Sequence, residues 1–593
     1  MSVIRTFRRS FNLLNKIEKR KLIIAIFWQG ALNILDLLGV LSLSLTTYTL
    51  TNKSLPKFSF FQNFKNENLH SLSVTLISLT IALFTIKGFV APILYSRIMK
   101  YLTRISINLS ESITRTFFAM PRSFHQKYRT QETIFSLSQG ITSAVNEVLG
   151  SSIILFSETL LLFFLIFIML ISNWVLTLLN FVLFSLTLYI LAKKVGGRQY
   201  NNSKARIESV IQGNSSLMDI ITGFREIFVS NKLDYFLDQF IVLRKKESKA
   251  ASSGLVLNIL PKYIFEITFY LCAGGVLVFL YNFTDEKYAF SLFVLFIASG
   301  TRILPSILRI QASVTGIRSN EALSNATFTL ISDLNSNKRI STPSTTRESQ
   351  FANGILIYIE SLKFSYPENP KWQLKIENLK IPSKAKVAIV GPSGSGKSTL
   401  IDLILGILEP DQGFIYFNSG SKLSSEEFKI AYMPQQISIL NRTLRENIAF
   451  GVLPLAIDDK SVLESISKSG LTDFVETLPG GIHQVLNESG TNLSGGQKQR
   501  IGFARALYQK PNLLILDEAT SSLDSESEFL ISDAVSNLTS DVTVVSIAHR
   551  LSTIKNFDLI IYMENGRVSE IGTFKELREK SSSFNLQAKL MEI

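Results

Sequence analysis

The sequence predicts a membrane-embedded all-α domain followed by an α/β domain. Two observations support this fold class. Hydrophobic residues make up 46% of the 593 residues and the mean hydropathy is +0.25, with the excess concentrated before residue 315. After residue 350, a short apolar strand runs directly into a glycine-rich loop and a helix. We expect a transmembrane domain with cytoplasmic helical extensions over residues 1–331, a linker over 332–350 and the α/β domain over 351–593.

Six segments before residue 315 are long and apolar enough to cross a bilayer. A helix needs about 20 residues to span about 30 Å of hydrocarbon. Residues 160–171 and 289–297, which lie inside two of these segments, contain no charge. The sequence therefore predicts a six-helix transmembrane domain. The expected spans are residues 22–49, 71–96, 145–172, 174–195, 256–281 and 287–311.

Basic residues are unevenly distributed among the connections between these spans. They are frequent in residues 97–141 and 196–254. The other connections hold only Lys53, Lys57, Lys65 and Lys287. By the positive-inside rule, the N-terminus, both basic segments and the α/β domain face the cytoplasm. Anionic lipid headgroups beside this basic face account for the net charge of +14, so no nucleic-acid partner is expected.

The two basic segments contain few Gly or Pro residues, which favours helices that continue beyond the bilayer. We expect each pair of helices to end in a short turn that contacts an α/β domain, near residues 124–130 and 224–236. The first apolar stretch is too long for a signal peptide and lacks a small-residue cleavage site. Cys272 is the only cysteine, which excludes an intrachain disulfide and indicates a packing residue.

A phosphate-binding loop is predicted at residues 391–398, which read Gly-Pro-Ser-Gly-Ser-Gly-Lys-Ser. Glycines let backbone N–H groups approach phosphate oxygens, and the following helix N-terminus adds partial positive charge. Lys397 is expected to hold the β- and γ-phosphates of ATP, and Ser398 to bind Mg²⁺. The other expected contacts of this loop are Gly391, Ser393, Gly394, Ser395, Gly396 and Thr399.

Two further apolar strands deliver polar residues to the same expected sheet edge. Residues 513–516 precede Asp517 and Glu518, and residues 542–547 precede His549. Asp517 is suited to bind Mg²⁺ through water, and Glu518 to polarise the water that attacks the γ-phosphate. His549 by itself is equally compatible with an ordinary residue at a strand end.

The run Leu-Ser-Gly-Gly-Gln at residues 493–497 has two compatible interpretations. Ser494 and Gln497 form a capping box that would begin any helix well. An outward-facing, glycine-flanked helix N-terminus is also an anion site. The partner of that site would be nucleotide on a second subunit, so we expect ATP to bind between two copies of this chain or of a close relative.

Residues 354–575 resemble the nucleotide-binding domain of ATP-binding cassette (ABC) transporters, with six motifs in family order. The resemblance implies an ABC-type P-loop NTPase fold that uses ATP and Mg²⁺. It implies that Tyr366 stacks on adenine, that Gln435 reaches Mg²⁺ and the attacking water, and that His549 contacts the γ-phosphate. It further implies that Ser494, Gly495 and Gly496 contact the opposite subunit's γ-phosphate and that Asp524 couples the two sites.

One stretch departs from the family pattern. Residues 487–490 read Asn-Glu-Ser-Gly, where Gly-Glu-Arg-Gly is common in exporters, and this concerns the loop that communicates with the membrane domain. Because Glu518, His549 and the signature are all present, a homodimer that hydrolyses two ATP molecules follows most simply.

Six spans followed by one ABC domain resemble a half-size ABC exporter, which implies ATP hydrolysis coupled to transport by alternating access. Ionisable residues inside spans are functional candidates because they are costly there. We expect Lys87, Lys262, Arg302 and Arg309 to bind an anionic headgroup. Pairing of Lys262 with Glu266, and extension of Arg309 to the interface, remain alternatives. Asp36 and Glu158 also lie in spans and have no assigned role.

Residues 302–310, residues 261–263 and the long first outer connection are similar to exporters that flip lipid-linked oligosaccharides for glycosylation. This resemblance implies a polyprenyl-pyrophosphate-linked substrate and a multi-pass protein of the bacterial inner membrane. Two alternatives stay open. The chain could export peptides, drugs or simple lipids, or it could be a nucleotide-gated channel or regulatory protein without transport.

Overall fold

The structure is a computed structural model of the chain, and it forms two compact units. The helical unit comprises residues 1–120 and 124–340, and the α/β unit comprises residues 121–123 and 341–593. The described residues are 2–52, 69–125, 127–172, 174–283, 286–337, 346–348, 354–366, 369–417, 428–487, 490, 492–517, 525–536, 538, 541–547 and 554–591.

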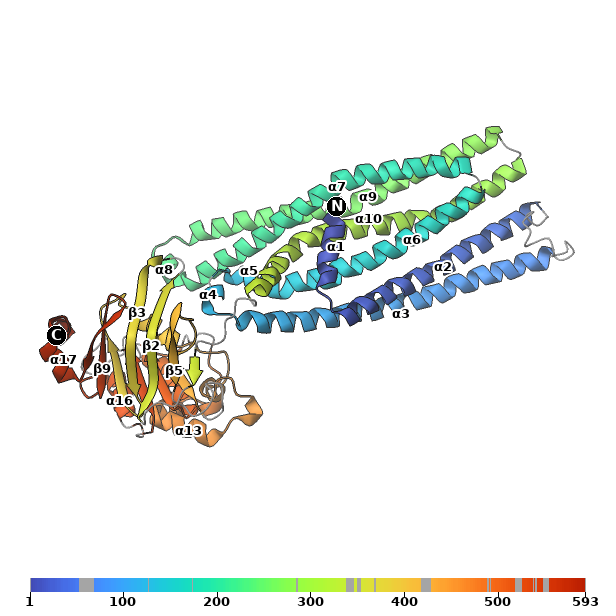
Figure 1. Ribbon diagram of the computed structural model, residues 1–593. Helices are drawn as coiled ribbons and strands as arrows, with labels where there is room; N and C mark the ends of the chain where they lie inside the picture. The colour runs from blue at the N-terminus through green and yellow to red at the C-terminus, as the bar shows by residue number, and fades with distance from the viewer. Residues whose placement is uncertain are drawn as a thin grey trace. The chain divides into compact units, whose positions relative to one another are not determined.

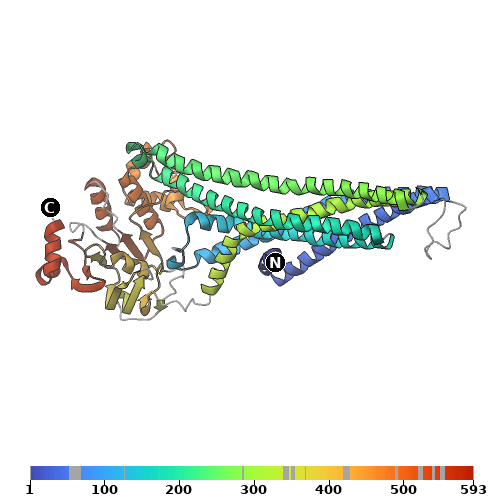
Figure 2. The same ribbon diagram turned by 90° about the horizontal axis from the view of Figure 1, so that it is seen from above.

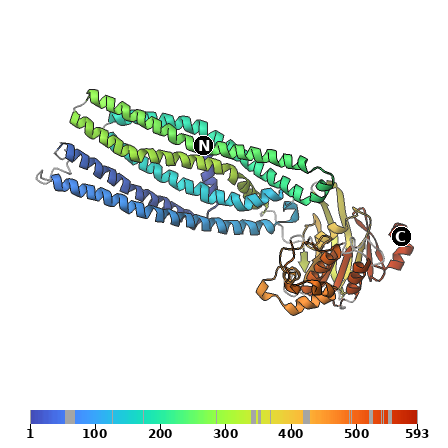
Figure 3. The ribbon, with the colours of Figure 1, turned by 180° about the vertical axis from the view of Figure 1, so that it is seen from behind.

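Long helices dominate the helical unit and run side by side along it (Figures 1 and 2). Figures 1 and 3 show α2 beside α3 and α7 beside α9, whereas α1 (Ser2–Asn12) crosses the long helices steeply. The long helices are α2 (Lys16–Asn52), α3 (Leu69–Phe118), α6 (Val148–Ser172), α7 (Trp174–Thr222), α9 (Leu233–Phe283) and α10 (Glu286–Asn337).

Four of the expected spans lie in helices that are long and apolar enough to cross a membrane, judged over the described residues. These stretches are residues 16–43, 73–118, 130–168 and 233–279. The two remaining expected spans lie in α7 and α10, where several side chains fall outside the described residues. The presence of six membrane spans therefore stays a prediction. It is supported by the six long helices, each of which contains all or nearly all of one expected span.

The basic segments are helical well beyond the expected spans, as predicted. Helix α3 continues to Phe118 and α7 to Thr222, while α9 begins at Leu233. Short helices occupy both predicted turn regions, namely α4 (Arg122–His125) and α8 (Phe224–Val229). Between α4 and α6 the chain forms α5 (Thr130–Phe135) and two π-helical turns, η3 (Ser136–Gly140) and η4 (Ser143–Glu147).

The π-helical turn η3 lies very close to α10. A Cβ atom at Gly140 would overlap the hydroxyl of Thr327, which is fully buried on α10. The Thr327 hydroxyl also donates a hydrogen bond to the Ser136 carbonyl at 2.8 Å. A wide π turn and a glycine together permit this approach.

The end of α10 differs from the expected linker boundary. The polar composition placed the linker at residues 332–350, but α10 continues to Asn337. Leu330 and Leu334 are buried on its last turns against Phe117 and Phe124, and Asp333 accepts a hydrogen bond from the Tyr128 hydroxyl at 2.5 Å. These tertiary contacts keep a polar segment helical that its composition alone marked as a linker.

The α/β unit is built on a ten-stranded sheet of order β1-β5-β2-β3-β10-β9-β4-β8-β7-β6 within the described residues. Strands β9, β4, β8, β7 and β6 pair in parallel, and β2 pairs antiparallel with β3 and β5. The strands are β1 (Thr346–Glu348), β2 (Ile355–Tyr366), β3 (Asn369–Pro382), β4 (Lys386–Val390), β5 (Gln412–Phe417), β6 (Ile430–Met433), β7 (Leu513–Asp517), β8 (Thr543–Ile547), β9 (Leu559–Glu564) and β10 (Arg567–Gly572). The three strands predicted before the glycine loop, Asp517 and His549 are confirmed as β4, β7 and β8.

Strand β4 is buried on both faces, as its continuous apolar run requires. Val387 and Ile389 pack in one core cluster with Leu400 and Ile404 of α11 (Lys397–Ile404). Ala388 and Val390 face a second cluster with residues of α17 and α18. The other helices are α12 (Leu444–Ile448), η5 (Pro454–Ala456), α13 (Asp459–Lys468), α14 (Thr472–Thr477), η6 (Gly481–His483), α15 (Gly495–Tyr508), α16 (Ser525–Ser536), α17 (Phe574–Lys580) and α18 (Ser582–Met591).

Candidate functional site

Four neighbouring parallel strands end at one edge of the sheet and carry the predicted site residues there. The glycine loop follows β4, and β8 ends at Ile547 just before residues 548–550. Asp517 ends β7, and Gln435 follows the end of β6 by two residues. Because Met433 pairs with Leu516 and Asp517 pairs with Ile547, the register brings these strand ends together.

The loop after β4 has the backbone geometry that its glycines permit. Gly391, Gly394 and Gly396 have φ angles of 155°, 80° and 103°, which favour glycine. A Cβ atom on Gly391 would also overlap the Met563 carbonyl of β9. Lys397 is only 6% exposed, and its ammonium donates to the carbonyls of Gly391 at 2.8 Å and Pro392 at 2.9 Å.

This loop fits the phosphates of ATP. The Ser395 hydroxyl is buried and forms no hydrogen bond within the described part of the chain. The Lys397 ammonium is held inside the same loop, and Ser398, the second residue of α11, is exposed. A buried cation, an unpaired hydroxyl and a helix N-terminus together suit a polyanion. Bound ATP would supply the phosphoanhydride bond whose hydrolysis releases free energy.

Asp517 has a partner that sequence reasoning missed. The Tyr432 hydroxyl, on the adjacent strand β6, donates to the Asp517 carboxylate at 3.0 Å. Tyr432 lies three residues before Gln435, inside a motif that was matched only for its glutamine. The tyrosine orients the carboxylate that is expected to bind Mg²⁺, as partners of metal ligands commonly do.

Tyr366 lies beside the phosphate loop. Its hydroxyl is 3.1 Å from the Thr399 hydroxyl, on the first turn of α11. Its ring packs edge-on against Phe364 and lies 5.9 Å from the ring of Trp372. Tyr366 therefore lies beside the predicted phosphate site, and its stacking on adenine stays a prediction.

Three predicted residues fall outside the described residues. They are Glu518, Asp524 and His549, and Glu488 and Ser489 of the departing stretch do so as well. Strands β7 and β8 lead directly to Glu518 and His549. Their expected roles therefore remain predictions.

The capping-box interpretation of the signature run is confirmed. The Ser494 side chain accepts a hydrogen bond from the Gln497 N–H at 3.2 Å, and the Gln497 side chain accepts one from the Ser494 N–H at 2.9 Å. Ser494 and Gly495 are exposed at the start of α15. The helix N-terminus is therefore accessible to an anion, as the second interpretation requires.

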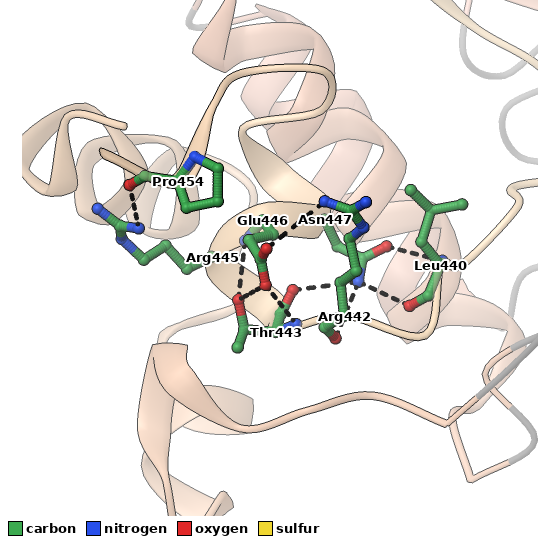
Figure 4. Close-up of polar contacts among 7 residues, drawn as sticks. All are labelled: Leu440, Arg442, Thr443, Arg445, Glu446, Asn447 and Pro454. Carbon is green, nitrogen blue, oxygen red and sulfur yellow. Dashed lines mark hydrogen bonds and ion pairs between the residues drawn. The ribbon is translucent and has the colours of Figure 1, made fainter. Parts of the chain in front are cut away.

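A buried polar network fixes the segment that follows Gln435. Asn447 of α12 is fully buried, and its amide group exchanges two hydrogen bonds with the Leu440 backbone and donates to the Thr443 carbonyl (Figure 4). The backbone carbonyl of Asn447 in turn accepts a hydrogen bond from the Arg505 guanidinium at 2.9 Å. Burial lowers the pKa of Arg505 to about 10. Arg505 lies on α15, so the signature helix is tied to the glutamine segment.

In the helical unit, the predicted cations have carboxylate partners. Asp36 on α2 is fully buried and forms an ion pair with Lys87 on α3. Arg302 on α10 lies 3.5 Å from the other Asp36 oxygen, which forms no hydrogen bond within the described residues. Two cations and one carboxylate leave this group with a formal charge of +1. Arg302 is 33% exposed and its guanidinium lies over the Phe84 ring at 4.3 Å.

The other two cations are paired one to one. Arg309 forms a two-point contact with Glu158 of α6, at 2.8 and 3.2 Å. Lys262 lies 3.9 Å from Glu266 on the same helix, which is the pairing considered as an alternative. Asp36 and Glu158, which had no assigned role, are thus the partners of three of the four cations.

An apolar cavity of about 320 Å³ lies among α6, α7, α9 and α10. Ile303, Ile307 and Ile310 line it from α10, the helix that also carries Arg302 and Arg309. The lining also includes Phe181 and Phe184 of α7 and Phe269 of α9.

Family comparison agrees with the architecture. The family model described as the ABC transporter transmembrane region matches residues 7–303, and the one described as ABC transporter matches residues 374–521. The chain belongs to the ABC transporter family. It has the half-size exporter arrangement, with one transmembrane region before one ATPase domain, and the sequence-based assignment to this family is confirmed.

The curated relatives of this ABC transporter differ in the share of their own length that this chain covers. It is 30% identical over 508 residues to the ATP-dependent lipid A-core flippase of Saccharophagus degradans, which covers 82% of each chain. It is 28% identical to ABC transporter B family member 1 of Dictyostelium discoideum, but spans only 56% of that protein. The match to the ABC-type transporter fsqE of Aspergillus fumigatus is 38% identical and covers 18% of that protein.

A solved structure shares the fold of this ABC transporter. It is a bacterial Atm1-family ABC exporter with ATP bound, and it superimposes with a TM-score of 0.73 at 19% identity. The match covers 97% of this chain and 99% of that one. This likeness extends the common fold to both units.

Proposed function

We propose that this protein is an ATP-driven exporter that works as a homodimer and moves an anionic amphiphile from the cytoplasmic to the outer side of the bacterial inner membrane. The candidate cargo is a lipid-linked oligosaccharide. The observation that carries this proposal is the Asp36–Lys87–Arg302 group, which keeps excess positive charge inside a membrane domain. Charges inside a bilayer are costly, so their presence indicates a function.

The amphiphilic nature of the cargo is supported by two neighbouring features of α10. Arg302 presents a partly exposed guanidinium, and Ile303 and Ile307 line the apolar cavity. A pyrophosphate headgroup would meet the cation, while a hydrocarbon tail would meet apolar side chains or lipid. The relatives named lipid A-core flippases, which this chain covers at 82%, support cargo of this class.

ATP would drive transport through closure of two ATPase domains. In this proposal Lys397 of one subunit and Ser494 of the other hold one nucleotide, with Ser398, Asp517 and Gln435 on Mg²⁺. Closure favours the outward-facing or occluded state, and hydrolysis through Glu518 resets the inward-facing state. Helices α4 and α8 end the cytoplasmic extensions, where we expect the motion to be transmitted.

The test is transport in vesicles reconstituted with the full-length protein. We expect a polyprenyl-pyrophosphate oligosaccharide to stimulate ATP hydrolysis and to be translocated, and Arg302→Ala to abolish translocation with basal hydrolysis retained. Arg115→Ala is the matched control, because Arg115 is 79% exposed and pairs only with Glu111 among the described residues. Undiminished translocation by Arg302→Ala would exclude the headgroup role.

The same vesicles separate the alternatives. Stimulation by peptides or by simple phospholipids, with none by the pyrophosphate lipid, would favour a different exporter. Nucleotide binding without movement of any cargo would favour a channel or a regulatory protein.

A further inference from the structure

Trp372 contacts the phosphate loop, although no motif includes it. Its indole N–H donates to the Gly394 carbonyl at 3.3 Å. Its ring also covers Gly396, because a Cβ atom there would lie 3.2 Å from Trp372 Cζ2. Trp372 is half-buried and packs against the main core cluster of the ATPase domain.

An irregularity in the sheet places Trp372 there. Strands β2 and β3 pair through Ser365 and Gln373, but the next pair is Tyr366 with Asn369. The three residues 370–372 therefore have no partner on β2, and the strand turns Trp372 toward the loop instead of along the ladder. Such bulges commonly redirect a side chain next to a functional site.

Trp372 and the β9–β10 turn together hold two successive carbonyls of the loop. The indole holds the Gly394 carbonyl, and the Gly566 N–H donates to the Ser395 carbonyl at 3.1 Å. In a planar trans peptide the C=O and N–H groups point in opposite directions. These two bonds therefore set the direction of the Ser395 and Gly396 N–H groups, the first of which closes a turn on Pro392 at 3.2 Å.

We propose that Trp372 is a positioning residue of the nucleotide site, which fixes the phosphate loop through the Gly394 carbonyl before nucleotide binds. Loops of this type bind phosphate through backbone N–H groups, so their affinity depends on how well those groups are oriented beforehand. Trp372 belongs to the ATPase domain, so this role is independent of the cargo.

The test compares full-length wild type with Trp372→Phe, which keeps an aromatic ring but removes the indole N–H. We expect the Kd for MgADP, measured by calorimetry, to rise about threefold to tenfold, as loss of one hydrogen bond predicts. The KM for ATP should rise similarly while kcat changes less. Trp174→Phe is the matched control, since Trp174 is 67% exposed in the helical unit.

A second readout follows Trp372 directly. In a Trp28→Phe, Trp174→Phe protein, Trp372 is the only tryptophan, because the chain has three. Its emission should change saturably with MgADP, at the Kd that calorimetry gives. An unchanged emission at saturation, or a Trp372→Phe affinity within twofold of wild type, would overturn the proposal. Loss of affinity together with loss of the thermal transition would assign Trp372 to the fold alone and overturn it too.

Discussion

Asp36 is fully buried and lies close to two cations, Lys87 and Arg302, whose contacts with its carboxylate differ. Lys87 donates a hydrogen bond to one carboxylate oxygen, whereas Arg302 only lies near the other and rests on Phe84. Lys87 is therefore the main counter-ion of a buried charge. Arg302 has donors to spare for an external anion.

This difference predicts that Lys87→Met destabilises the helical unit by about 3 kcal/mol, because it leaves a buried carboxylate without its main partner. Arg302→Met should cost much less. The measurement is thermal unfolding of the purified protein in detergent. Adding Asp36→Asn to Lys87→Met should restore most of the loss, and failure of this rescue would show that Lys87 stabilises the fold by other means.

At single residues, sequence reasoning succeeded where the chemistry is local. The phosphate loop and the Ser494–Gln497 box were predictable because each motif is contiguous. Tyr432 and Trp372 were not, since their partners depend on strand register and on a bulge. The pairing of Lys262 with Glu266 was considered because both residues lie on one helix, four positions apart. The carboxylate partners of Lys87, Arg302 and Arg309 lie on other helices and were missed, because nearly all-apolar helices carry no periodic signal that sets their rotation about the axis.

At the scale of elements, Asn447 connects the segment after Gln435 with α12 and α15. Asn447→Ala should lower the local opening free energy by about 3 kcal/mol, because it leaves several buried backbone groups without partners. Hydrogen–deuterium exchange of peptides covering residues 436–448 measures this in the full-length protein. Arg442→Ala is the control from the same segment, since the Arg442 side chain is 57% exposed and its 3.6 Å ion pair with Glu446 should contribute little.

The caps of the ATPase helices predict a dependence on pH. Hydrogen bonds from the Thr443 hydroxyl and N–H lower the pKa of Glu446 below its ordinary value of 4.5, and hydrogen bonds from Thr573 do the same for Glu576. A folded-state pKa below the unfolded value gives stability that is present above the unfolded pKa. That stability is lost as the pH falls through the folded pKa.

We therefore expect faster hydrogen exchange in α12 and α17 as the pH drops below about 4.5, after correction for the intrinsic exchange rate. Thr443→Val removes the hydroxyl that donates to Glu446, so it should weaken this dependence in α12 and leave α17 unchanged. An identical dependence in the variant would exclude Glu446 as its source.

For elements, the sequence predicted the long helices, both short turns and the central strands. The β2–β3–β5 antiparallel part was not predicted. Its predicted site residue, Tyr366, stands at the very end of β2, so the motif does not indicate how the preceding residues pair. The expected linker begins at residue 332, whereas α10 continues to Asn337. Ser and Asn near residue 335 suggested a linker, whereas burial of Leu330 and Leu334 keeps the helix intact.

At the scale of the whole molecule, the proposed homodimer predicts that Ser393 of one subunit approaches Ser494 of the other when ATP is bound. Both residues are exposed within the ATPase domain. In a Cys272→Ala background, Ser393→Cys with Ser494→Cys should give an intermolecular crosslink with a short bifunctional reagent. The crosslink should require MgATP and should increase with Glu518→Gln, which is expected to bind ATP without hydrolysing it.

A mixture of two proteins, one carrying only Ser393→Cys and the other only Ser494→Cys, is tested in the same way. A crosslink in this mixture would show that the two cysteines come from different subunits. Absence of the crosslink in every nucleotide state would contradict the shared site. Equal crosslinking without nucleotide would contradict the proposal that ATP closes the dimer.

The close approach at Gly140 has a consequence for how the helical unit can move. The Thr327 hydroxyl donates a hydrogen bond to the backbone of η3, and it occupies the space that a Cβ atom at Gly140 would need. If α10 slid along the neighbouring helix, the buried Thr327 hydroxyl and the Ser136 carbonyl would lose their hydrogen bond, which is costly. The helical segment of residues 130–172 and α10 should therefore tilt together as one rigid body. The helix rearrangement that the proposed alternating access requires would then have to occur between other pairs of helices.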